Sequence, residues 1–279
     1  MTETTIGLLH PGEMGAAVGA VLRGAGCDVV WASAGRSSAT ADRAAAADLA
    51  DAGTVAELTR RADVILSVCP PHAALEVARE VAGFGGVFVD ANAVSPVTSR
   101  AVGKAIEDGG GTYVDGGIVG SPPTAAGTTR LYVSGEAAPT VAELFEATIV
   151  DARVLSDRIG DASAMKMIYA AWTKGAAALV LDVRALARES GLEPELLADW
   201  NESLPHLPGM SLQSARSAAT KGWRWTAEME EIAATFAAAG LPDGFHLAAA
   251  ELFRRSPRLD DADADEATLD AVLRGIAGS

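Results

Sequence analysis

Apolar and polar positions alternate in blocks through the first 157 residues. Short runs rich in Val, Ile and Leu are followed by a Gly or Pro break and then by alanine-rich stretches of helical composition. Strands that alternate with helices predict βαβ units and a mostly parallel sheet. The predicted strands are 5-TIGLLH-10, 28-DVVWA-32, 63-DVILSV-68, 86-GVFVDA-91, 112-TYVDG-116 and 130-RLYVSG-135.

The strand pattern ends near Gly160, and helical spacing replaces it. From Asp161 to Glu189 the apolar positions recur at helical intervals, until Gly191 and Pro194 break the pattern. Shorter helical patterns follow at 195–203, 211–220, 226–239 and 245–254. Their predicted breaks are Pro205, Pro208, Gly222, Gly240 and Pro242. We therefore predict an α/β fold in two domains, a doubly wound parallel sheet over residues 1–157 and an all-helical domain over residues 158–279.

Charge and composition narrow the possible partners. The chain of 279 residues has 22 basic and 37 acidic side chains, a formal net charge of −15. Nucleic acids and anionic membranes bind clustered Lys and Arg, so neither is an expected partner. The most apolar late window, residues 175–188, is interrupted by Asp182 and Arg184, and the N-terminus lacks the order of a signal peptide. Two distant cysteines and four scattered histidines predict no metal site, and the expected location is the cytoplasm.

The first predicted strand runs into 6-IGLLHPGEMG-15, which resembles a dinucleotide-binding glycine loop. Gly12 and Gly15 match the glycine that lets phosphate approach and the glycine that packs the following helix. His10 replaces the first, turn-forming glycine, and Pro11 fixes a backbone angle of the turn. An ordinary loop is the alternative, but the position between strand and helix favours a coenzyme. The predicted contacts are His10, Pro11, Gly12, Glu13, Met14 and Gly15.

The end of the second predicted strand indicates which coenzyme is preferred. A site for NAD(H) usually has an acid there for the ribose hydroxyls, whereas a site for NADP(H) has cations and hydroxyls for the 2′-phosphate. The segment 28-DVVWASAGRSS-38 has no acid at its end, but it has Ser33, Arg36 and Ser37. We therefore predict NADP(H) in preference to NAD(H). A serine-rich surface turn with an exposed arginine is the alternative.

Four motifs in order resemble the β-hydroxyacid dehydrogenase superfamily, which includes 6-phosphogluconate and 3-hydroxyisobutyrate dehydrogenases and, more distantly, imine reductases. They are the glycine loop, 67-SVCPP-71, 92-NAVSPVTS-99 and 160-GDASAMKMIYAAWTKG-175. The resemblance spans essentially the whole chain and implies a Rossmann-type domain followed by a helical substrate and dimerisation domain. It also implies coenzyme contacts from Cys69, Pro70 and Asn92, and Lys166 as the catalytic residue.

Two positions depart from the pattern of the superfamily. Val119 stands where its substrate loop usually has a serine, which leaves Gly120 and Ser121 as the nearest candidate substrate contacts. Ala170 replaces an asparagine of the catalytic helix. Both changes weaken the case for a small 3-hydroxy acid as substrate. Ser95 is a further substrate candidate, and capping of a helix ahead of Pro96 is the competing explanation.

A lysine on a helix that borders the coenzyme suits hydride transfer, because the substrate oxygen must lose or gain a proton as the hydride moves. Helical spacing places Tyr169, Thr173 and Lys174 near the face of Lys166, as candidate substrate contacts. Solvent-exposed lysines on an amphipathic helix are the alternative interpretation.

The sequence thus predicts an NADP(H)-dependent oxidoreductase that acts on a small polar hydroxy or carbonyl compound. An imine reductase on the same scaffold and a coenzyme-binding regulator without turnover are the alternatives. A homodimer through the helical domain is expected, because a long apolar helix needs more cover than one small domain provides.

Overall fold

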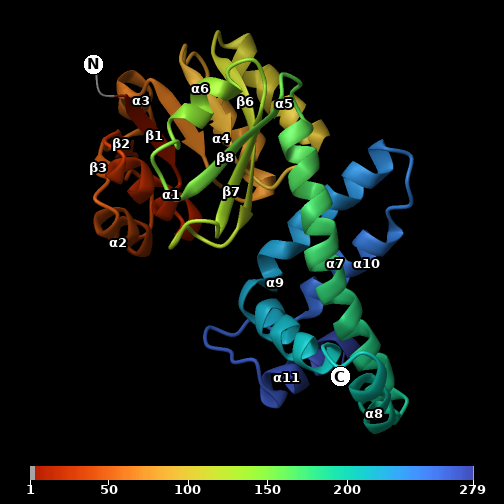
Figure 1. Ribbon diagram of the computed structural model, residues 1–279. Helices are drawn as coiled ribbons and strands as arrows, with labels where there is room; N and C mark the ends of the chain where they lie inside the picture. Colours follow the sequence, from red (N-terminus) through yellow and green to blue (C-terminus); the bar gives the residue numbers. More distant parts are fainter. Residues whose placement is uncertain (1–3, 279) are drawn as a thin grey trace. The chain divides into compact units, whose positions relative to one another are not determined.

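The computed structural model describes residues 4–278 (Figure 1). The chain divides into two compact units, with the boundary after Met167. That boundary falls inside a long helix, whereas the sequence pattern placed it ahead of the helix, after residue 157. Each unit has its own core and is described by itself.

The first unit contains one eight-stranded sheet in the order β3-β2-β1-β4-β5-β6-β7-β8, and all neighbours are parallel except β6 and β7. This confirms the predicted α/β class with a mostly parallel sheet. The strands are β1 Thr5–Leu9, β2 Asp28–Trp31, β3 Ala50–Asp51, β4 Val64–Ser67, β5 Val87–Asp90, β6 Thr112–Gly120, β7 Thr129–Ser134 and β8 Val150–Ser156.

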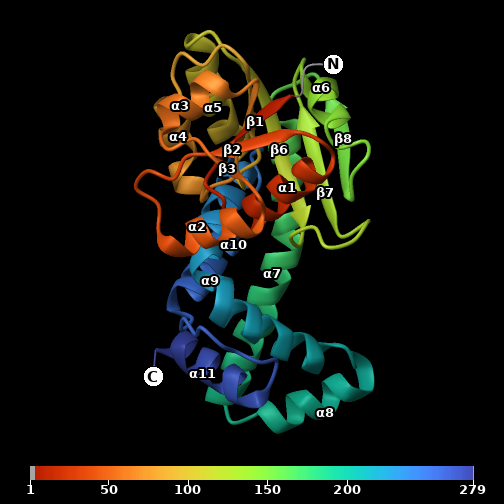
Figure 2. The same cartoon turned by 90° about the vertical axis from the view of Figure 1, so that its left-hand side faces the viewer.

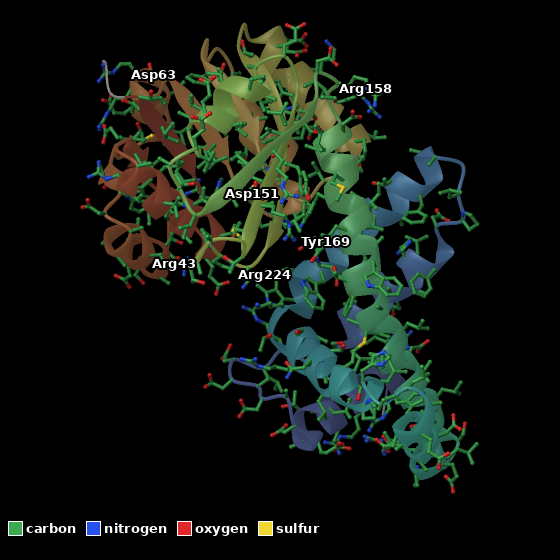
Figure 3. The ribbon with its side chains drawn as sticks, viewed as in Figure 1. Arg43, Asp63, Asp151, Arg158, Tyr169 and Arg224 are labelled. Carbon is green, nitrogen blue, oxygen red and sulfur yellow. The ribbon has the colours of Figure 1, made fainter. Side chains whose placement is uncertain are left out.

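Two of these strands were absent from the predicted set. β3 has only two residues, which is too short for a pattern. β8 lies at the edge of the sheet and carries the exposed ion pair of Asp151 and Arg153, so it lacks the apolar run of a buried strand. Figure 3 labels Asp151 on this edge.

Helices cover both faces of the sheet (Figure 2). One apolar cluster joins the sheet to α1, α2 and α6, and a second joins its other face to α3, α4 and α5. This double cover explains why the central strands read as continuous apolar runs. The helices are α1 Glu13–Gly24, α2 Ser38–Ala46, α3 Val55–Arg61, the short 3₁₀ turn η1 Pro71–Ala73, α4 Ala74–Glu80, α5 Pro96–Asp108 and α6 Ala138–Glu143.

The second unit is helical throughout its described part. Its first helix, α7, spans Asp161–Glu189 as predicted and begins in the first unit (green in Figure 1). The other helices are α8 Glu193–Ser203, α9 Leu207–Ala238, α10 Gly244–Arg255 and α11 Glu266–Ala277.

The predicted break at Gly222 is wrong, because α9 continues through it as a single helix. Gly222 is buried, with Phe253 of α10 beside it. The packing of α9 on α10 outweighs the cost of about 1 kcal/mol for a glycine inside a helix. The sequence pattern also missed α11, whose start lies in the acidic run, where Asp265 caps it by accepting from the Thr268 N–H at 2.9 Å.

A buried arginine ties three helices of this unit together. Arg184 of α7 is 1% exposed and pairs with Glu193 of α8 at 2.7 Å, while it also donates to Ser211 of α9 at 2.8 Å. The ion pair explains how Arg184, which interrupts an apolar window, is accommodated in the core. Among residues 4–278, no helix combines the length and the apolar character needed to cross a bilayer.

Candidate functional site

The candidate site lies in the first unit, where the strand order reverses. β1 stands between β2 and β4, so the connections that leave these strands go to opposite sides of β1. In open α/β sheets this reversal leaves a crevice at the carboxyl ends of the strands, and ligands bind there. The loop 10–12 leaves β1 at this point and opens α1.

Gly12 and Gly15 serve different purposes in this loop. A Cβ on Gly15 would lie 2.8 Å from the carbonyl oxygen of His10, so glycine is required for α1 to pack on the end of β1. Gly12 has an ordinary backbone conformation, with φ −70°, and a Cβ there would meet no protein atom within 4 Å. Neither the backbone nor the described protein packing requires glycine at this position. Close approach by a ligand would require it.

His10 is one of two described non-glycine residues with positive φ, at 66°. The first position of the loop therefore adopts the left-handed conformation that glycine favours, and histidine tolerates it better than most residues. Its carbonyl oxygen accepts from the Gly12 N–H at 2.7 Å, which closes the turn. Burial and the charge of Arg36 lower the pKa of His10 to about 4. The imidazole is therefore neutral at physiological pH.

Two arginines from the segment after β2 lie beside this loop. Arg36 acts electrostatically on both His10 and Cys69, so its guanidinium lies within electrostatic range of the ends of β1 and β4. The Nε atom of Arg36 is buried and has no hydrogen-bond partner among residues 4–278. Arg43 of α2, labelled in Figure 3, donates to the carbonyl oxygen of Pro11 at 3.3 Å. Arg43 was not among the predicted coenzyme contacts, although it is the only basic residue of α2.

The predicted serines of this segment have different environments. Ser37 caps α2 by accepting from the Thr40 N–H at 3.3 Å, so part of its hydrogen-bonding capacity serves the helix. Ser33 accepts the Arg36 N–H through its carbonyl oxygen at 3.0 Å, which forms the turn that carries the arginine.

Asn92 connects the ends of β4 and β5. Its Oδ1 accepts from the Cys69 N–H at 2.5 Å, and its Nδ2 donates to Ser67 at 3.2 Å and to Asp90. The side chain is buried, so it holds the 69–70 loop in place. Pro70, which follows, is exposed at the same edge. A direct coenzyme contact by Asn92 stays a prediction.

Two acidic side chains are buried behind this edge. Burial and then the charge of Asp115 raise the pKa of Asp90 to about 7. The Cys69 thiol has its pKa raised to about 12, first by burial and then by Asp90. Cys69 is therefore a neutral thiol rather than a nucleophile.

Asp115 of β6 holds the start of α7. Its carboxylate accepts five hydrogen bonds, from Ser99, Ser134, the Gly160 N–H and both the N–H and the hydroxyl of Ser163. A carboxylate at a helix N-terminus is favoured by the helix dipole, and five donors suit an acceptor that carries charge. The first turn of α7 is therefore fixed to the sheet at this point.

Lys166 lies one turn beyond this attachment. A Cβ on Gly117 of β6 would lie 2.8 Å from both the Ala162 carbonyl oxygen and the Cβ of Lys166. The missing side chain of Gly117 thus lets the lysine stem lie directly against β6. Lys166 is half-buried and belongs to the same unit as the glycine loop. Its catalytic role stays a prediction.

The remaining substrate candidates occupy separate places. Ser95 caps α5 by accepting from the Thr98 N–H at 3.2 Å and is buried, so the capping explanation is present in the structure. Gly120 has φ 114°, and a Cβ there would lie 2.0 Å from the Thr128 carbonyl oxygen. This close approach explains the glycine without a substrate. Ser121 is exposed after β6.

The candidates on α7 beyond the boundary belong to the second unit. Lys174 forms an ion pair with Glu228 at 2.7 Å, and its ammonium lies 5.5 Å from the ring centroid of Trp225. Thr173 donates to the carbonyl oxygen of Tyr169 at 3.3 Å, and both side chains are exposed. Figure 3 labels Tyr169 on α7. A substrate that binds the Lys174 ammonium would have to compete with Glu228 for it.

Comparison with known families identifies the first unit. A family model described as the NAD binding domain of 6-phosphogluconate dehydrogenase matches residues 5–149, which is more than half of the chain. The chain belongs to this family. In this 6-phosphogluconate dehydrogenase-like protein, residues 187–256 also match a domain of unknown function, DUF1932.

Two individual proteins are similar to this chain in sequence or in fold. An uncharacterised 28.5 kDa protein of Methanothermus fervidus is 31% identical over 148 residues, which cover 53% of this chain and 57% of that protein. The match therefore spans little more than half of the length of this curated relative. A conserved hypothetical protein of Sinorhizobium meliloti has a solved structure that is 26% identical, with a TM-score of 0.69 and coverage of 98% and 97% of the two chains.

The fold extends to a characterised dehydrogenase. The structure of Mycobacterium tuberculosis 3-hydroxyisobutyrate dehydrogenase with L-serine has a TM-score of 0.71 at 20% identity, with coverage of 97% of this chain and 98% of that one. At this identity the likeness concerns the fold alone.

The residues of this 6-phosphogluconate dehydrogenase-like protein fit a dinucleotide. No side chain caps α1 at Gly12, the space where its Cβ would lie is open, and buried donor-capable nitrogens of His10 and Arg36 lack protein partners in the described chain. A helix N-terminus beside a side-chain-free loop and a cation is suited to phosphate groups.

Proposed function

We propose that the protein is an NADP(H)-dependent oxidoreductase that acts on a small polar hydroxy compound or its carbonyl, with Lys166 as the acid/base. The observation that carries the proposal is the fixed position of Lys166. Its stem lies against Gly117, one turn beyond the attachment of α7 to Asp115, in the unit that also contains the glycine loop. Membership of the NAD-binding family supports the coenzyme half of the proposal.

The roles of the residues follow from their positions. The loop 10–15 and Arg36 would hold the coenzyme, which when bound supplies or accepts the hydride. Lys166 takes the hydroxyl proton of the substrate in the direction of oxidation and returns it to the carbonyl oxygen in the direction of reduction. Asp115 positions the turn that carries Lys166. The free cysteines Cys27 and Cys69 are compatible with the cytoplasmic location that we propose.

A substrate screen tests the proposal. Oxidation of NADPH and reduction of NADP⁺ would be followed by absorbance with hydroxy acids, sugar acids, aldehydes, ketones and cyclic imines. Turnover of a hydroxy or carbonyl compound is the expected result. Turnover confined to imines would replace the proposal with an imine reductase, and tight NADPH binding without any turnover would replace it with a coenzyme-binding regulator.

Arg36 is expected to select the coenzyme. We predict that Arg36→Ala weakens NADPH binding by roughly 10- to 100-fold, because a charge-assisted contact to the 2′-phosphate is lost, and leaves NADH binding within about 3-fold. Fluorescence titration of both reduced coenzymes measures this. Arg79→Ala, on the exposed side of α4, is the matched control. Equal losses for the two coenzymes would contradict the assignment of the 2′-phosphate to Arg36.

The second unit has a surface that suits a homodimer, and we propose that a second copy covers it. Ile168, Trp172, Leu179 and Leu186 of α7 are 61%, 77%, 50% and 69% exposed. At about 100° per residue these four side chains fall within roughly 40° of one another around the helix. They form an apolar stripe along α7, interrupted at Gly175, which is buried beside Phe245 of α10. An isologous pair of such stripes would bury both.

Negative charges introduced on the apolar stripe of α7 should dissociate the proposed homodimer. We expect the wild-type protein to be a dimer by light scattering coupled to size exclusion, and the double variant Trp172→Glu, Leu186→Glu to be a monomer, because it would bury like charges at the seam. Leu204→Glu places the same charge at an exposed apolar position outside the stripe and should stay dimeric. A monomeric wild type, or a dimeric double variant, would refute the stripe as the interface.

A further inference from the structure

The unusual residue of the glycine loop is His10, and no hydrogen bond to another side chain or to the backbone of residues 4–278 explains its Nδ1 atom. The backbone requirement at this position is a left-handed conformation, which glycine meets at lower cost. The Nδ1 atom of His10 is buried and has no hydrogen-bond partner in the described chain. A buried polar atom without a partner costs free energy. A role in the turn alone therefore does not account for histidine.

A second nitrogen in the same condition lies nearby. The Nε of Arg36 is also buried without a partner within residues 4–278, and the guanidinium charge acts directly on the imidazole of His10. The two side chains come from different elements, the end of β1 and the turn after β2. His10 lies two residues ahead of Gly12, where a Cβ would meet no protein atom within 4 Å and where α1 begins. One anion placed here would give both nitrogens an acceptor.

We propose that His10 and Arg36 form a phosphate clamp for the coenzyme, in which His10 takes up a proton as the phosphate arrives. This inference rests on the proposed coenzyme binding and adds a residue, a charge state and a pH dependence to it. In the free protein the imidazole is neutral, because burial and the neighbouring guanidinium disfavour a second positive charge. A phosphate between the two groups reverses that balance, since its negative charge favours the imidazolium.

The other charged and titratable groups around His10 do not supply the negative charge that would favour its protonation in the free protein. Arg43 of α2 is bonded to the Pro11 carbonyl oxygen, and it adds positive charge on the same side. The Cys69 thiol after β4 stays neutral, because its pKa is raised to about 12. Glu13 starts α1 with an exposed side chain. Among the described residues, Arg36 is the charge that acts on the pKa of His10.

Isothermal titration calorimetry of the full-length protein tests the proposal without turnover. NADPH and NADH would be titrated at pH 6.5 in buffers with different ionisation enthalpies, which gives the number of protons taken up on binding. The matched variant is His10→Asn, because asparagine also tolerates the left-handed conformation and forms hydrogen bonds but does not titrate. The wild type should take up about half a proton to one proton more than the variant. The variant should bind NADPH roughly 10-fold more weakly at this pH.

The two coenzymes test whether the clamped phosphate is the one assigned to Arg36. Extra uptake by the wild type with NADPH alone supports the clamp with the 2′-phosphate as its ligand. Equal extra uptake with NADH places His10 at the shared pyrophosphate, apart from the phosphate assigned to Arg36, and overturns the clamp. Equal proton uptake by wild type and His10→Asn overturns the clamp and leaves coenzyme binding intact. Failure of the wild type to bind either coenzyme overturns the proposed function, and the clamp with it.

Discussion

Lys166→Ala is expected to lower turnover by about 10²- to 10⁴-fold, which is the usual contribution of a positioned acid/base. The affinity for NADPH should change little, because the predicted coenzyme contacts lie on the loops after β1, β2, β4 and β5 and not on α7. Lys166→Arg should lose as much, since arginine keeps the positive charge but does not release its proton. Steady-state rates and coenzyme titrations on the same preparations measure both effects.

Two additional observations would separate a proton relay from a structural role. A small primary amine added to Lys166→Ala should restore part of the turnover, because it supplies the missing acid/base from solution. Lys104→Ala, a change at an exposed lysine of α5 paired with Asp108, should keep full activity. Turnover of Lys166→Ala within a few-fold of the wild type would exclude the lysine as the acid/base.

The order of elements was predictable because the central strands are buried on both faces and the helices follow a regular pattern. The predicted bounds of α7, Asp161–Glu189, are confirmed. The errors have local causes. β8 is a polar edge strand, α11 begins within a run of acidic residues, and Gly222 lies where packing on Phe253 overrides a weak helix preference. The spacing of apolar and polar residues along the chain does not show which distant residues pack against one another.

The candidate site was predictable only in part. The sequence indicated which loops form it, but not which side chains of different loops and helices contact one another. The glycine loop, Arg36 and Asn92 lie at the carboxyl edge of one sheet, as strand order requires. The left-handed backbone of His10 and the bond from Arg43 to Pro11 depend on how α1 and α2 pack, and neither follows from a motif. Asp115 gave an available signal: an acid within the apolar run 112-TYVDGGIV-119.

Buried polar side chains connect the two halves of the site. On one side, Asp90 and Asn92 hold the 69–70 loop, which carries predicted coenzyme contacts. On the other, Asp115 holds the first turn of α7. Asp90 and Asp115 interact electrostatically. Asp115 accepts hydrogen bonds on both carboxylate oxygens, whereas the Oδ2 of Asp90 is buried without a hydrogen-bond partner among residues 4–278. Burial and the neighbouring carboxylate raise the pKa of Asp90 to about 7, so Asp90 keeps its proton to near neutral pH.

Ionisation of Asp90 should therefore destabilise the first unit as the pH rises. Its pKa is about 7 in the folded protein and near its ordinary value of 3.8 when unfolded, so the folded state binds more protons between these values. The stabilisation is fully present below about pH 4 and is lost as the pH rises through about 7, with a total of roughly 4 kcal/mol. The side chain of Asp90→Asn stays neutral, so the variant should not lose this stabilisation. Its free energy of unfolding, relative to that of the wild type at the same pH, should therefore be higher at pH 8 than at pH 4.5.

The difference between the two proteins isolates Asp90 from the other carboxylates. Urea unfolding at pH 4.5, 6 and 8, followed by hydrogen exchange in peptides from β5 and β6, reports on the unit that contains the pair and not on the helical unit. Asp42→Asn, at an exposed position of α2, should differ from the wild type by a constant amount at all three pH values. If Asp90→Asn also shows a constant difference, Asp90 does not titrate near pH 7. The inference that Asp90 keeps its proton to near neutral pH in the folded protein would then be wrong.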